Sequence, residues 1–324
     1  SGMIPENSIS PCDHLPQLDD FSSGAEDFDP ALLAQTVVIK LNGGLGTSMG
    51  LQKAKSLLPV KGEDTFLDII AHQILHLRQE TGANVRFLLM NSFSTSQDTL
   101  DHMEVYADQD LSGAEKIELM QNQVPKIDAA SLTPVVWEKT PSNEWCPPGH
   151  GDLYAALAGS GWLDALLDSG VKYAFVSNSD NLGATLDARL LRYFAESDKP
   201  FLMEVTRRTQ VDKKGGHLAV RNSDKQMLLR EVAQCPEEDL AEFQNIDKHR
   251  YFNTNSLWIR LDVLKQLLDQ EDGALPLPMI KNKKTVDPRD KESTPVIQLE
   301  IAMGAAIESF AGSGAVCVPR SRFA

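Results

Sequence analysis

The sequence predicts an α/β fold in which helices cover both faces of a sheet. Short apolar runs rich in β-branched residues, such as TVVIKL at residues 36–41, are typical of strands buried on both faces. Between these runs lie segments whose apolar residues recur at helical spacing, and this alternation favours a sheet between two helical layers. The chain has 324 residues, 42% of them hydrophobic, which is enough for one large core with or without a smaller appendage.

The chain begins with a segment that is not expected to join the sheet. Ser1 and Gly2 before Met3 are typical of residues left by expression. Residues up to about 30 are rich in Asp, Glu, Ser and Pro, which favours a loosely ordered or peripheral lead-in over a sheet element. We therefore divide the chain into a lead-in, 1–30, and one domain, 31–324.

The first half of that domain alternates regularly. The strand at 36–41 is followed by a glycine-rich turn and then by a helix that ends near Thr81 and Gly82. The apolar face of this helix is formed by residues at helical spacing: Phe66, Ile69, Ile70, Ile74 and Leu77. The same two periodicities predict the remaining elements of this half: a strand at 85–90, a helix at 152–167 and a strand at 173–178.

The second half contains shorter pieces. We expect a strand at 201–206, hairpin-like strands at 217–220 and 228–232, and an amphipathic helix. The stripe of this helix, which predicts core packing, consists of four leucines: Leu261, Leu264, Leu267 and Leu268. Residues 281–294 are charged and contain proline, so we expect a surface loop or a subdomain insertion there.

Composition excludes several classes of function. A net charge of −15 opposes binding to nucleic acid or to an anionic membrane, because there is no basic stripe to release counterions. No apolar run is long enough to span a membrane, and no signal peptide follows Met3. The four cysteines are far apart in the sequence, which favours ordinary thiols in a reducing compartment, and we expect a cytoplasmic protein.

The turn after the first strand is the strongest local signal. Residues 41–50 read LNGGLGTSMG, and their glycines let backbone N–H groups approach an anion without obstruction by Cβ atoms. The Walker pattern is not matched, because Met49 and Gly50 are not followed by Lys and Ser or Thr. The dinucleotide fingerprint fails too, since Gly50 lies one residue too far from Gly46. A tight turn without a ligand remains the alternative.

Two further positions suit phosphate chemistry. Lys55 follows the glycine turn closely enough to return to a bound phosphate as a point charge, although an exposed lysine is the common alternative. Asp180 follows the strand at 173–178, and the carboxyl ends of parallel strands are where ligands of α/β proteins gather. A carboxylate there suits Mg²⁺, which takes few protein ligands, while a turn or helix-capping aspartate is the alternative.

These residues and their order along the chain resemble a known family. The glycine turn followed by KSLLPV is similar to the signature of the eukaryotic-type UTP–glucose-1-phosphate uridylyltransferases. The resemblance recurs in order from about Leu33 to the last residue. Its further blocks are FLLMNSF (87–93), PPGHGD (147–152), VSNSDNLGAT (176–185), KGGHL (214–218), FNTNSLWI (252–259), VIQLEIAMGAAI (296–307) and VPRSRF (318–323). The family that uses N-acetylglucosamine 1-phosphate has an arginine where this chain has Ser48, which favours glucose.

The resemblance implies a fold, a reaction and a set of site residues. The fold would be a Rossmann-like mixed sheet of the nucleotide-diphospho-sugar transferase type, and residues 31–324 would be its catalytic domain. A phosphate oxygen of glucose 1-phosphate would attack the α-phosphorus of UTP, giving UDP-glucose and pyrophosphate with Mg²⁺ as cofactor. This chemistry needs positioning and charge neutralisation more than a nucleophilic side chain.

The implied residues divide into three groups: catalytic, nucleotide-binding and sugar-phosphate-binding. Lys55 and Asp180 would be catalytic, with Asp180 also holding the metal and contacting the substrate. Nucleotide contacts would come from eight residues: Leu41, Asn42, Gly43, Gly44, Lys55, Gln121, Gly149 and Asn178. Gln121 would read uracil, although Gln123 lies close enough to compete. Sugar-phosphate contacts would come from His150, Gly216, Asn253, Asn255 and Glu300.

Alternatives remain at the level of function. An N-acetylhexosamine 1-phosphate enzyme would share the fold, and a weakly active nucleotide-sugar-binding relative would keep the glycine turn. A nicotinamide-dependent dehydrogenase is disfavoured by the glycine spacing. Relatives continue past VPRSRF with a second lysine that touches the UTP phosphates and with a left-handed β-helix, so we expect this chain to be truncated relative to them and a poor catalyst unless Lys40 or Lys214 substitutes.

Overall fold

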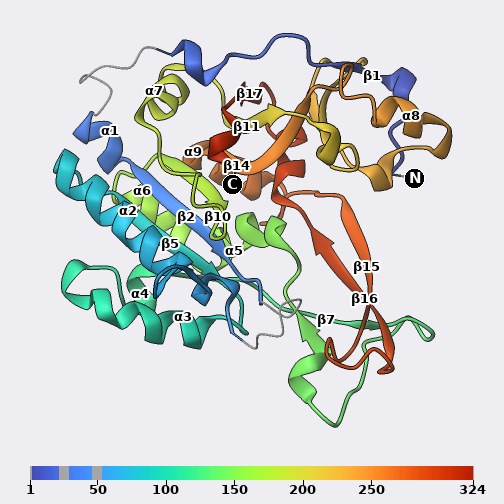
Figure 1. The fold of residues 1–324 in the computed structure, drawn as a ribbon, viewed down its shortest axis with the longest axis horizontal. Coiled ribbons are helices and arrows are strands. Elements are labelled where there is room, and N and C mark those ends of the chain that lie inside the picture. Colours follow the sequence, from blue (N-terminus) through green and yellow to red (C-terminus); the bar gives the residue numbers. More distant parts are fainter. Residues whose placement is uncertain (1, 22–28, 46–52, 324) are drawn as a thin grey trace.

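In the computed structural model, which describes residues 2–21, 29–45 and 53–323, a mixed sheet divides the molecule (Figure 1). Its parallel half has the order β10-β2-β5-β6. The bounds of these strands are β2 Thr36–Asn42, β5 Arg86–Asn91, β6 Glu118–Met120 and β10 Tyr173–Asn178. Beyond β10 the sheet continues through β14 (Tyr251–Arg260), which runs antiparallel to it. The α/β prediction is therefore confirmed, and the mixed character of the sheet agrees with the fold that the resemblance implies.

The other half of the sheet is built around β14. Strand β11 (Phe201–Arg207) pairs with β14 on one side and with β17 (Gly314–Cys317) on the other, and β12 (His217–Arg221) joins β14 through a single register pair. Two further strands complete the described sheet, β13 Met227–Arg230 and β1 Ile9–Pro11, and both pair with β12. The predicted hairpin is thus present, although Val232 lies beyond its second strand.

Helices cover both faces of the sheet because its strands are apolar on both sides. Val37 and Ile39 of β2 face one core and Val38 faces the other. The helices are α1 Pro30–Ala34, α2 Phe66–Thr81, α3 Ser96–Met103, α4 Ala114–Ile117, α5 Leu153–Gly159, α6 Trp162–Asp168, α7 Ala188–Glu196, α8 Leu240–Phe243 and α9 Leu261–Gln270. Helices α5, α6 and α9 contribute to the first core, and α2 and α7 to the second. A small hairpin, β3 Pro59–Lys61 with β4 Asp64–Thr65, precedes α2.

One predicted helix is two helices. Residues 152–167 were expected to be continuous, but α5 ends at Gly159 and α6 begins at Trp162. The break lies at Gly161, whose φ of 81° belongs to the left-handed region that glycine adopts without steric cost. The predicted stop of α2 is confirmed, since Gly82 closes that helix in the left-handed conformation.

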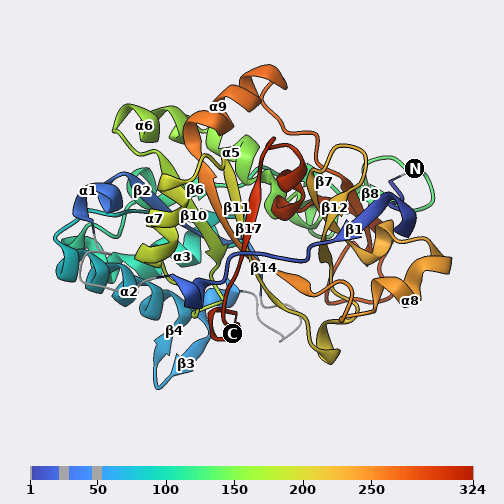
Figure 2. The same cartoon turned by 90° about the horizontal axis from the view of Figure 1, so that it is seen from above.

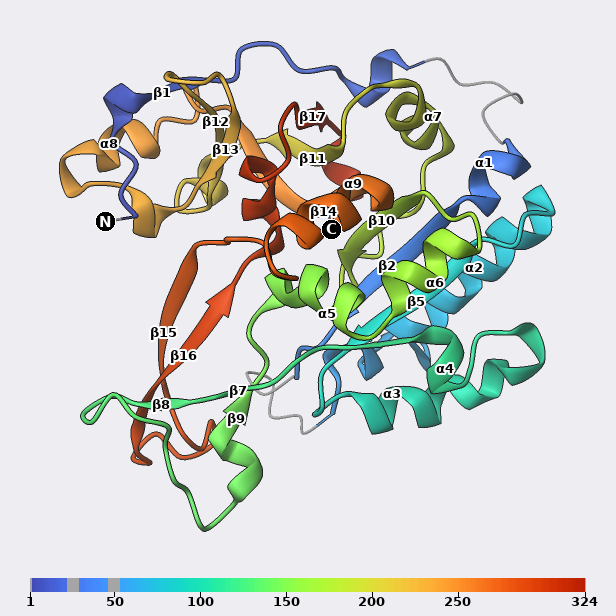
Figure 3. The same cartoon turned by 180° about the vertical axis from the view of Figure 1, so that it is seen from behind.

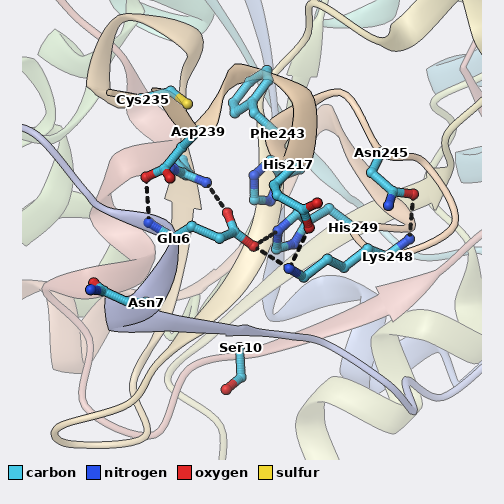
Figure 4. A network of polar contacts seen from close by, with 12 residues as sticks. Glu6, Asn7, Ser10, His217, Cys235, Asp239, Phe243, Asn245, Lys248 and His249 are labelled. Carbon is cyan, nitrogen blue, oxygen red and sulfur yellow. Dashed lines mark hydrogen bonds and ion pairs between the residues drawn. The ribbon is translucent and has the colours of Figure 1, made fainter. Parts of the chain in front are cut away.

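One part of the expectation for the lead-in is wrong, namely that it supplies no sheet element. Strand β1 is part of the central sheet, and the segment that follows it crosses the molecule toward α1 (Figure 2). Figure 4 shows the anchor of this segment, the Glu6 carboxylate, which lies 2.5 Å from an Arg230 nitrogen, 2.8 Å from His249 Nε2 and 2.9 Å from Lys248 Nζ. Leu18 is 1% exposed. One of the acidic residues of the lead-in, Glu6, thus contributes its charge to a network with buried partners.

Residues 281–294, expected to form a surface loop or a subdomain insertion, are partly strand and belong to a small separate sheet. Residues up to 285 belong to β15 (Met279–Thr285), which pairs in antiparallel register with β16 (Pro295–Ile301), so the expected loop covers only residues 286–294. Strand β16 also pairs with β8 (Ile127–Asp128), and a separate ribbon joins β7 (Val124–Pro125) to β9 (Trp145–Cys146). These strands together form an arm that projects from the central sheet (Figure 3).

The four cysteines are free and buried, as their spacing predicts. Among the described residues, no helix has the length and apolar character needed to span a membrane.

Candidate active site

The carboxyl ends of three parallel strands meet at one edge of the sheet. Leu41 of β2 lies in register with Asn178 of β10 on one side and with Met90 of β5 on the other. Two segments are tied to these ends: Ser179 N, just after β10, donates to the Leu41 carbonyl, and Gln121 N, just after the neighbouring strand β6, donates to the Asn91 carbonyl of β5. Ligands of open α/β sheets bind at this kind of edge.

A cavity of about 290 Å³ opens there. Its described lining contains most of the residues that the sequence singled out, drawn from positions up to 259 residues apart. They are Leu41, Gly43, Gly44, Lys55, Gln121, Gly149, His150, Asn178, Asp180 and Glu300. The predicted residues that do not line it are Asn42, Gly216, Asn253 and Asn255.

The glycine turn is held from both sides where the structure describes it. The Ser92 hydroxyl donates to the Gly43 carbonyl at 2.9 Å, and Lys55 N donates to the Gly44 carbonyl at 3.0 Å. A Cβ on Gly43 would come within 2.5 Å of Gln121 Oε1, so the close approach of these two residues requires glycine. Ser48, on which the sugar preference rests, lies outside the described residues.

Lys55 and Asp180 meet in this cavity. Lys55 Nζ lies 2.5 Å from Asp180 Oδ2, and the two side chains are 44% and 35% exposed. The pair brings a cation and a carboxylate together at the end of β10, where a ligand can reach both.

A magnesium ion fits this donor set. Within the described part of the chain no three His, Cys, Asp or Glu side chains cluster to form a protein cage. Mg²⁺ does not need one, because it binds through one or two carboxylates and takes substrate phosphates and waters for the rest. Asp180 supplies a hard oxygen ligand that faces the cavity.

Gln121 and Gly149 form the inner wall. Gln121 is 6% exposed, and its Nε2 donates to the Gly149 carbonyl at 2.7 Å. That bond leaves Oε1 as an acceptor on the cavity side. Gly149 has a φ of 83°, and a Cβ there would come within 2.4 Å of the Ile301 carbonyl oxygen. Gln123, which the sequence left as an alternative, is exposed and does not line the cavity.

His150 has a defined protonation state. Its Nδ1 accepts a hydrogen bond of 3.0 Å from the Met303 backbone N–H. Burial lowers the pKa of this imidazole to about 4, so the ring is neutral at pH 7. With Nδ1 occupied as an acceptor, the proton resides on Nε2, which makes His150 a hydrogen-bond donor.

Three predicted sugar contacts lie outside the cavity, on the β14 side. Strand β14 has a bulge opposite Glu204 and Val205, where Thr254 and Asn255 are skipped in the register with β11 and Asn255 takes a φ of 61°. A Cβ on Gly304 would come within 2.9 Å of Asn253 Nδ2. Asn253 therefore lies beside Gly304, the residue that follows Met303, whose N–H donates to His150. Gly216 lies against Glu231, whose carboxylate oxygen would be 2.5 Å from an added Cβ.

Two other predicted groups are committed elsewhere. The amide of Asn42 donates to Asn91 Oδ1 at 2.7 Å and to Thr99 Oγ1 at 2.9 Å, and its oxygen accepts from Ser56, so this side chain braces the turn without facing the cavity. Lys40, expected as a possible substitute for a second phosphate-binding lysine, is 2% exposed and cannot reach the cavity. The alternative substitute, Lys214, is exposed and does not line the cavity.

Sequence reasoning missed four residues. Met90, Pro147 and Ser179 line the cavity, and all three lie inside blocks that carry the resemblance. The pairing of parallel strand ends could have located Met90. Glu231 has no sequence signal, but burial raises the pKa of its carboxyl, and it is a carboxylate beside Gly216 of the kind that binds sugar hydroxyls.

A larger cavity, of about 730 Å³, lies between α2 and β2. Its walls are mainly apolar, with Ile70, Ile74 and Leu77 of α2 among them, and it does not include the strand ends. The smaller cavity has the groups that phosphate chemistry requires, and we assign the site to it.

The chain was compared with known proteins. A sequence profile of the family described as UTP–glucose-1-phosphate uridylyltransferase matches residues 3–324. The enzyme of that name from Saccharomyces cerevisiae is 45% identical over 295 residues, which cover 90% of this chain and 57% of the yeast protein. The barley (Hordeum vulgare) enzyme is 44% identical over 301 residues, 92% of this chain and 61% of that protein. The chain thus spans less than two thirds of these relatives.

Solved structures show the same likeness. A UDP-glucose phosphorylase from Trypanosoma brucei is 55% identical with a TM-score of 0.91, covering 100% of this chain and 69% of that one. A variant of UDP-glucose pyrophosphorylase from Leishmania major, solved in complex with UDP-glucose, is 50% identical with a TM-score of 0.89 at the same coverage.

Proposed function

Because this chain belongs to the UTP–glucose-1-phosphate uridylyltransferase family, we propose that it carries the site that forms UDP-glucose and pyrophosphate from UTP and glucose 1-phosphate. The observation that carries the proposal is the meeting of Lys55, Asp180, Gln121 and the glycine turn in one cavity. These groups would neutralise phosphate charge, bind a metal and read a base, and the reaction needs all three.

Gln121 supports uracil as the base. Its Nε2 is engaged by the Gly149 carbonyl, so the free Oε1 can accept a hydrogen bond from the N3–H of uracil. Cytosine has an acceptor at N3, which would face that oxygen unfavourably. A pocket with a committed hydrogen-bonding group discriminates strongly against a base that cannot satisfy it.

The phosphates would lie between the glycine turn and Lys55. Backbone N–H groups at Gly43 and Gly44 can approach an anion closely, and Lys55 adds a point charge. The reaction is a displacement: a phosphate oxygen of the sugar forms a bond to the α-phosphorus, and the bond from that phosphorus to the bridging oxygen of pyrophosphate breaks. Lys55 would lower the charge on the attacked group, and Nε2–H of His150 would hold a phosphate oxygen in place.

Mg²⁺ would be held by Asp180, and when bound it neutralises phosphate charge and fixes the phosphates relative to one another. The sugar hydroxyls would be bound on the β14 side by Asn253 and Asn255, with Gly216 allowing close backbone approach and Glu300 at the rim. We also propose a cytoplasmic role in carbohydrate metabolism, which four free thiols and a UDP-sugar product support.

The test is a pyrophosphate-release assay with UTP, Mg²⁺ and a panel of sugar 1-phosphates. We expect glucose 1-phosphate to give the highest kcat/KM, with CTP in place of UTP giving less than about 1% of that value. A higher kcat/KM with N-acetylglucosamine 1-phosphate would show that the chain is an N-acetylhexosamine 1-phosphate uridylyltransferase instead. Nucleotide binding without any pyrophosphate release would identify a nucleotide-sugar-binding relative.

A further inference from the structure

The loop that carries Asp180 is held from behind by a buried lysine. This loop, residues 178–185, leaves the end of β10 and leads toward α7. Lys40 Nζ donates to Ser177 Oγ at 2.7 Å and to the Ala184 carbonyl at 2.7 Å. One ammonium group therefore joins Ser177, which directly precedes the loop, to Ala184 near its end, and it does so from β2, where Lys40 lies in register with Ser177.

The outer side of the loop rests on Arg322. The Arg322 guanidinium donates to the Thr185 carbonyl at 3.0 Å, and the Asn181 amide donates to the Arg322 carbonyl at 3.1 Å. Gly183 packs so closely on this segment that a Cβ would lie 2.3 Å from the Ser321 carbonyl oxygen. These contacts leave the loop little freedom on the side away from the cavity.

The two cations share one counter-ion. Glu204 is fully buried and receives two bonds from Arg322, Nε to Oε2 and Nη2 to Oε1, both at 2.9 Å. Trp258 Nε1 donates to the same carboxylate. Burial, and then the charge of Arg322, lower the pKa of Lys40 to about 7, while Glu204 acts in the opposite direction. An apolar side chain would cost less at this position than a lysine without its own carboxylate.

We propose that Lys40 is a positioning residue, whose two hydrogen bonds fix the ends of loop 178–185 and so aim the Asp180 carboxylate into the cavity. That Asp180 then binds a metal rests on the function proposed above, but the ordering of the loop does not. Lys40 touches no substrate in this scheme and acts only through the loop.

The experiment compares Lys40→Met with two other variants. Ser177→Ala removes one of the two bonds and serves if the methionine variant does not fold. Lys126→Met is the matched control, because Lys126 is also buried, at 5% exposed, and its Nζ donates to a backbone carbonyl, that of Val286, at 2.9 Å in the arm. Two readouts are used: hydrogen exchange of backbone amides, and Mn²⁺ binding followed by electron paramagnetic resonance.

In Lys40→Met we expect the amides of residues 179–185 to exchange about tenfold faster, the equivalent of about one net hydrogen bond. The affinity for Mn²⁺ in the presence of UTP should fall by about the same factor, while the affinity for metal-free UTP stays within about twofold. Ser177→Ala should show a smaller effect in the same direction. Lys126→Met should accelerate exchange near residue 286 and leave 179–185 unchanged.

Unchanged exchange in 179–185 would overturn the proposal, and so would faster exchange with unchanged Mn²⁺ affinity. If the unsubstituted chain binds no UTP, the proposed function fails, but the exchange data still decide whether Lys40 orders the loop.

Discussion

The hydrogen-bonding state of individual residues at the cavity is set by partners that are distant in the sequence. His150 is the clearest case, because its tautomer is set by the Met303 N–H, 153 residues away. A neutral imidazole with its proton on Nε2 can donate to a phosphate oxygen but adds no positive charge. Among the described residues that line the cavity, positive charge therefore comes from Lys55.

The first prediction concerns that imidazole. The pKa of about 4 lies below the ordinary histidine value of 6.5, so His150 should remain neutral throughout pH 5.5–8. Folding favours the neutral form, so the associated stability is present above pH 6.5 and is lost as pH falls from 6.5 to 4. In ¹⁵N-histidine NMR at pH 7, one resonance pair should show the Nε2–H tautomer and disappear in His150→Gln. An imidazolium signal assigned to His150 at pH 6 would refute this.

The second prediction concerns Asp180. Asp180→Asn keeps the shape of the side chain but removes the charge that would bind Mg²⁺, so kcat should fall by at least about 10²-fold. The melting temperature should stay within about 2 °C, because this ion pair is partly exposed. Asp198→Asn, at an exposed position before β11, is the matched control and should keep full activity. Near-normal Mg²⁺-dependent turnover of Asp180→Asn would contradict the metal assignment.

Much of the site could be predicted at this scale, since Lys55 and Asp180 follow strands whose ends must meet. The hydrogen-bond partners of Lys40 could not be predicted from the sequence. Its strand is buried on both faces, so periodicity does not reveal which partners a polar side chain finds there. The side-chain partners of Asn42 could not be predicted for a related reason, because the backbone pattern of a glycine turn does not say which way a side chain points.

Secondary-structure elements show where composition and periodicity mislead. The break between α5 and α6 occurs in a stretch whose apolar spacing continues on both sides of Gly161. Strand β1 has three residues, too few for a period-2 pattern to be recognised, and it lies among acidic residues. Neither the φ of Gly161 nor the ion pairs of Glu6 that anchor the segment of β1 is visible in the apolar pattern.

The helix break gives a matched pair of variants. Gly161→Ala should lower the free energy of unfolding by about 1 kcal/mol, because alanine is disfavoured at a φ of 81°. Gly159 lies in α5 with negative φ, so Gly159→Ala should raise the free energy of unfolding by about 0.5 kcal/mol. An added Cβ meets nothing within 4 Å at either position, so packing does not interfere. Urea midpoints that shift in the same direction for both variants would refute the backbone explanation.

The anchor of the N-terminal segment gives another test. Burial alone would raise the pKa of the Glu6 carboxyl, but hydrogen bonds from Lys248, His249 and Arg230 lower it to about 2. Because the folded pKa is below the unfolded value of 4.5, the stabilisation is fully present above pH 4.5 and is lost as pH falls toward 2. Glu6→Gln should therefore cost about 2 kcal/mol at pH 7.

The cost of Glu6→Gln should shrink below pH 4.5, as urea unfolding at pH 7, 4.5 and 3.5 can show. Glu63→Gln, at an exposed position in the turn between β3 and β4, is the control and should cost nothing measurable. An equal cost at every pH would mean that the Glu6 side chain acts by shape alone.

Across the whole molecule, the central sheet separates two cores and places the site where three of its parallel strands end. This architecture followed from the sequence, because alternating apolar runs and amphipathic segments leave few other ways to bury both faces of a strand. The pairing of the strands in the arm did not follow from the sequence. Strand β15 is mostly exposed and rich in lysine, and it pairs with β16 across the intervening residues 286–294.

At this scale, nucleotide binding should stabilise the entire fold. At a UTP concentration of 100 times Kd with Mg²⁺, the gain is about 2.7 kcal/mol, which corresponds to a rise of about 5 °C in Tm. CTP should give less than about 1 °C under the same conditions, because Oε1 of Gln121 meets an acceptor. Equal shifts from UTP and CTP would show that Gln121 does not read the base.

The contact between Lys55 and Asp180 has a consequence for which ligands can enter. Each group is the counter-ion of the other. An anion that binds Lys55 alone is therefore repelled by the negative charge of Asp180, and a cation that binds Asp180 alone is repelled by the positive charge of Lys55. A ligand that arrives with both signs of charge can exchange partners with both groups at once. In a protein with a net charge of −15, we expect this arrangement to favour a ligand whose negative charge is already neutralised when it arrives over a free polyanion.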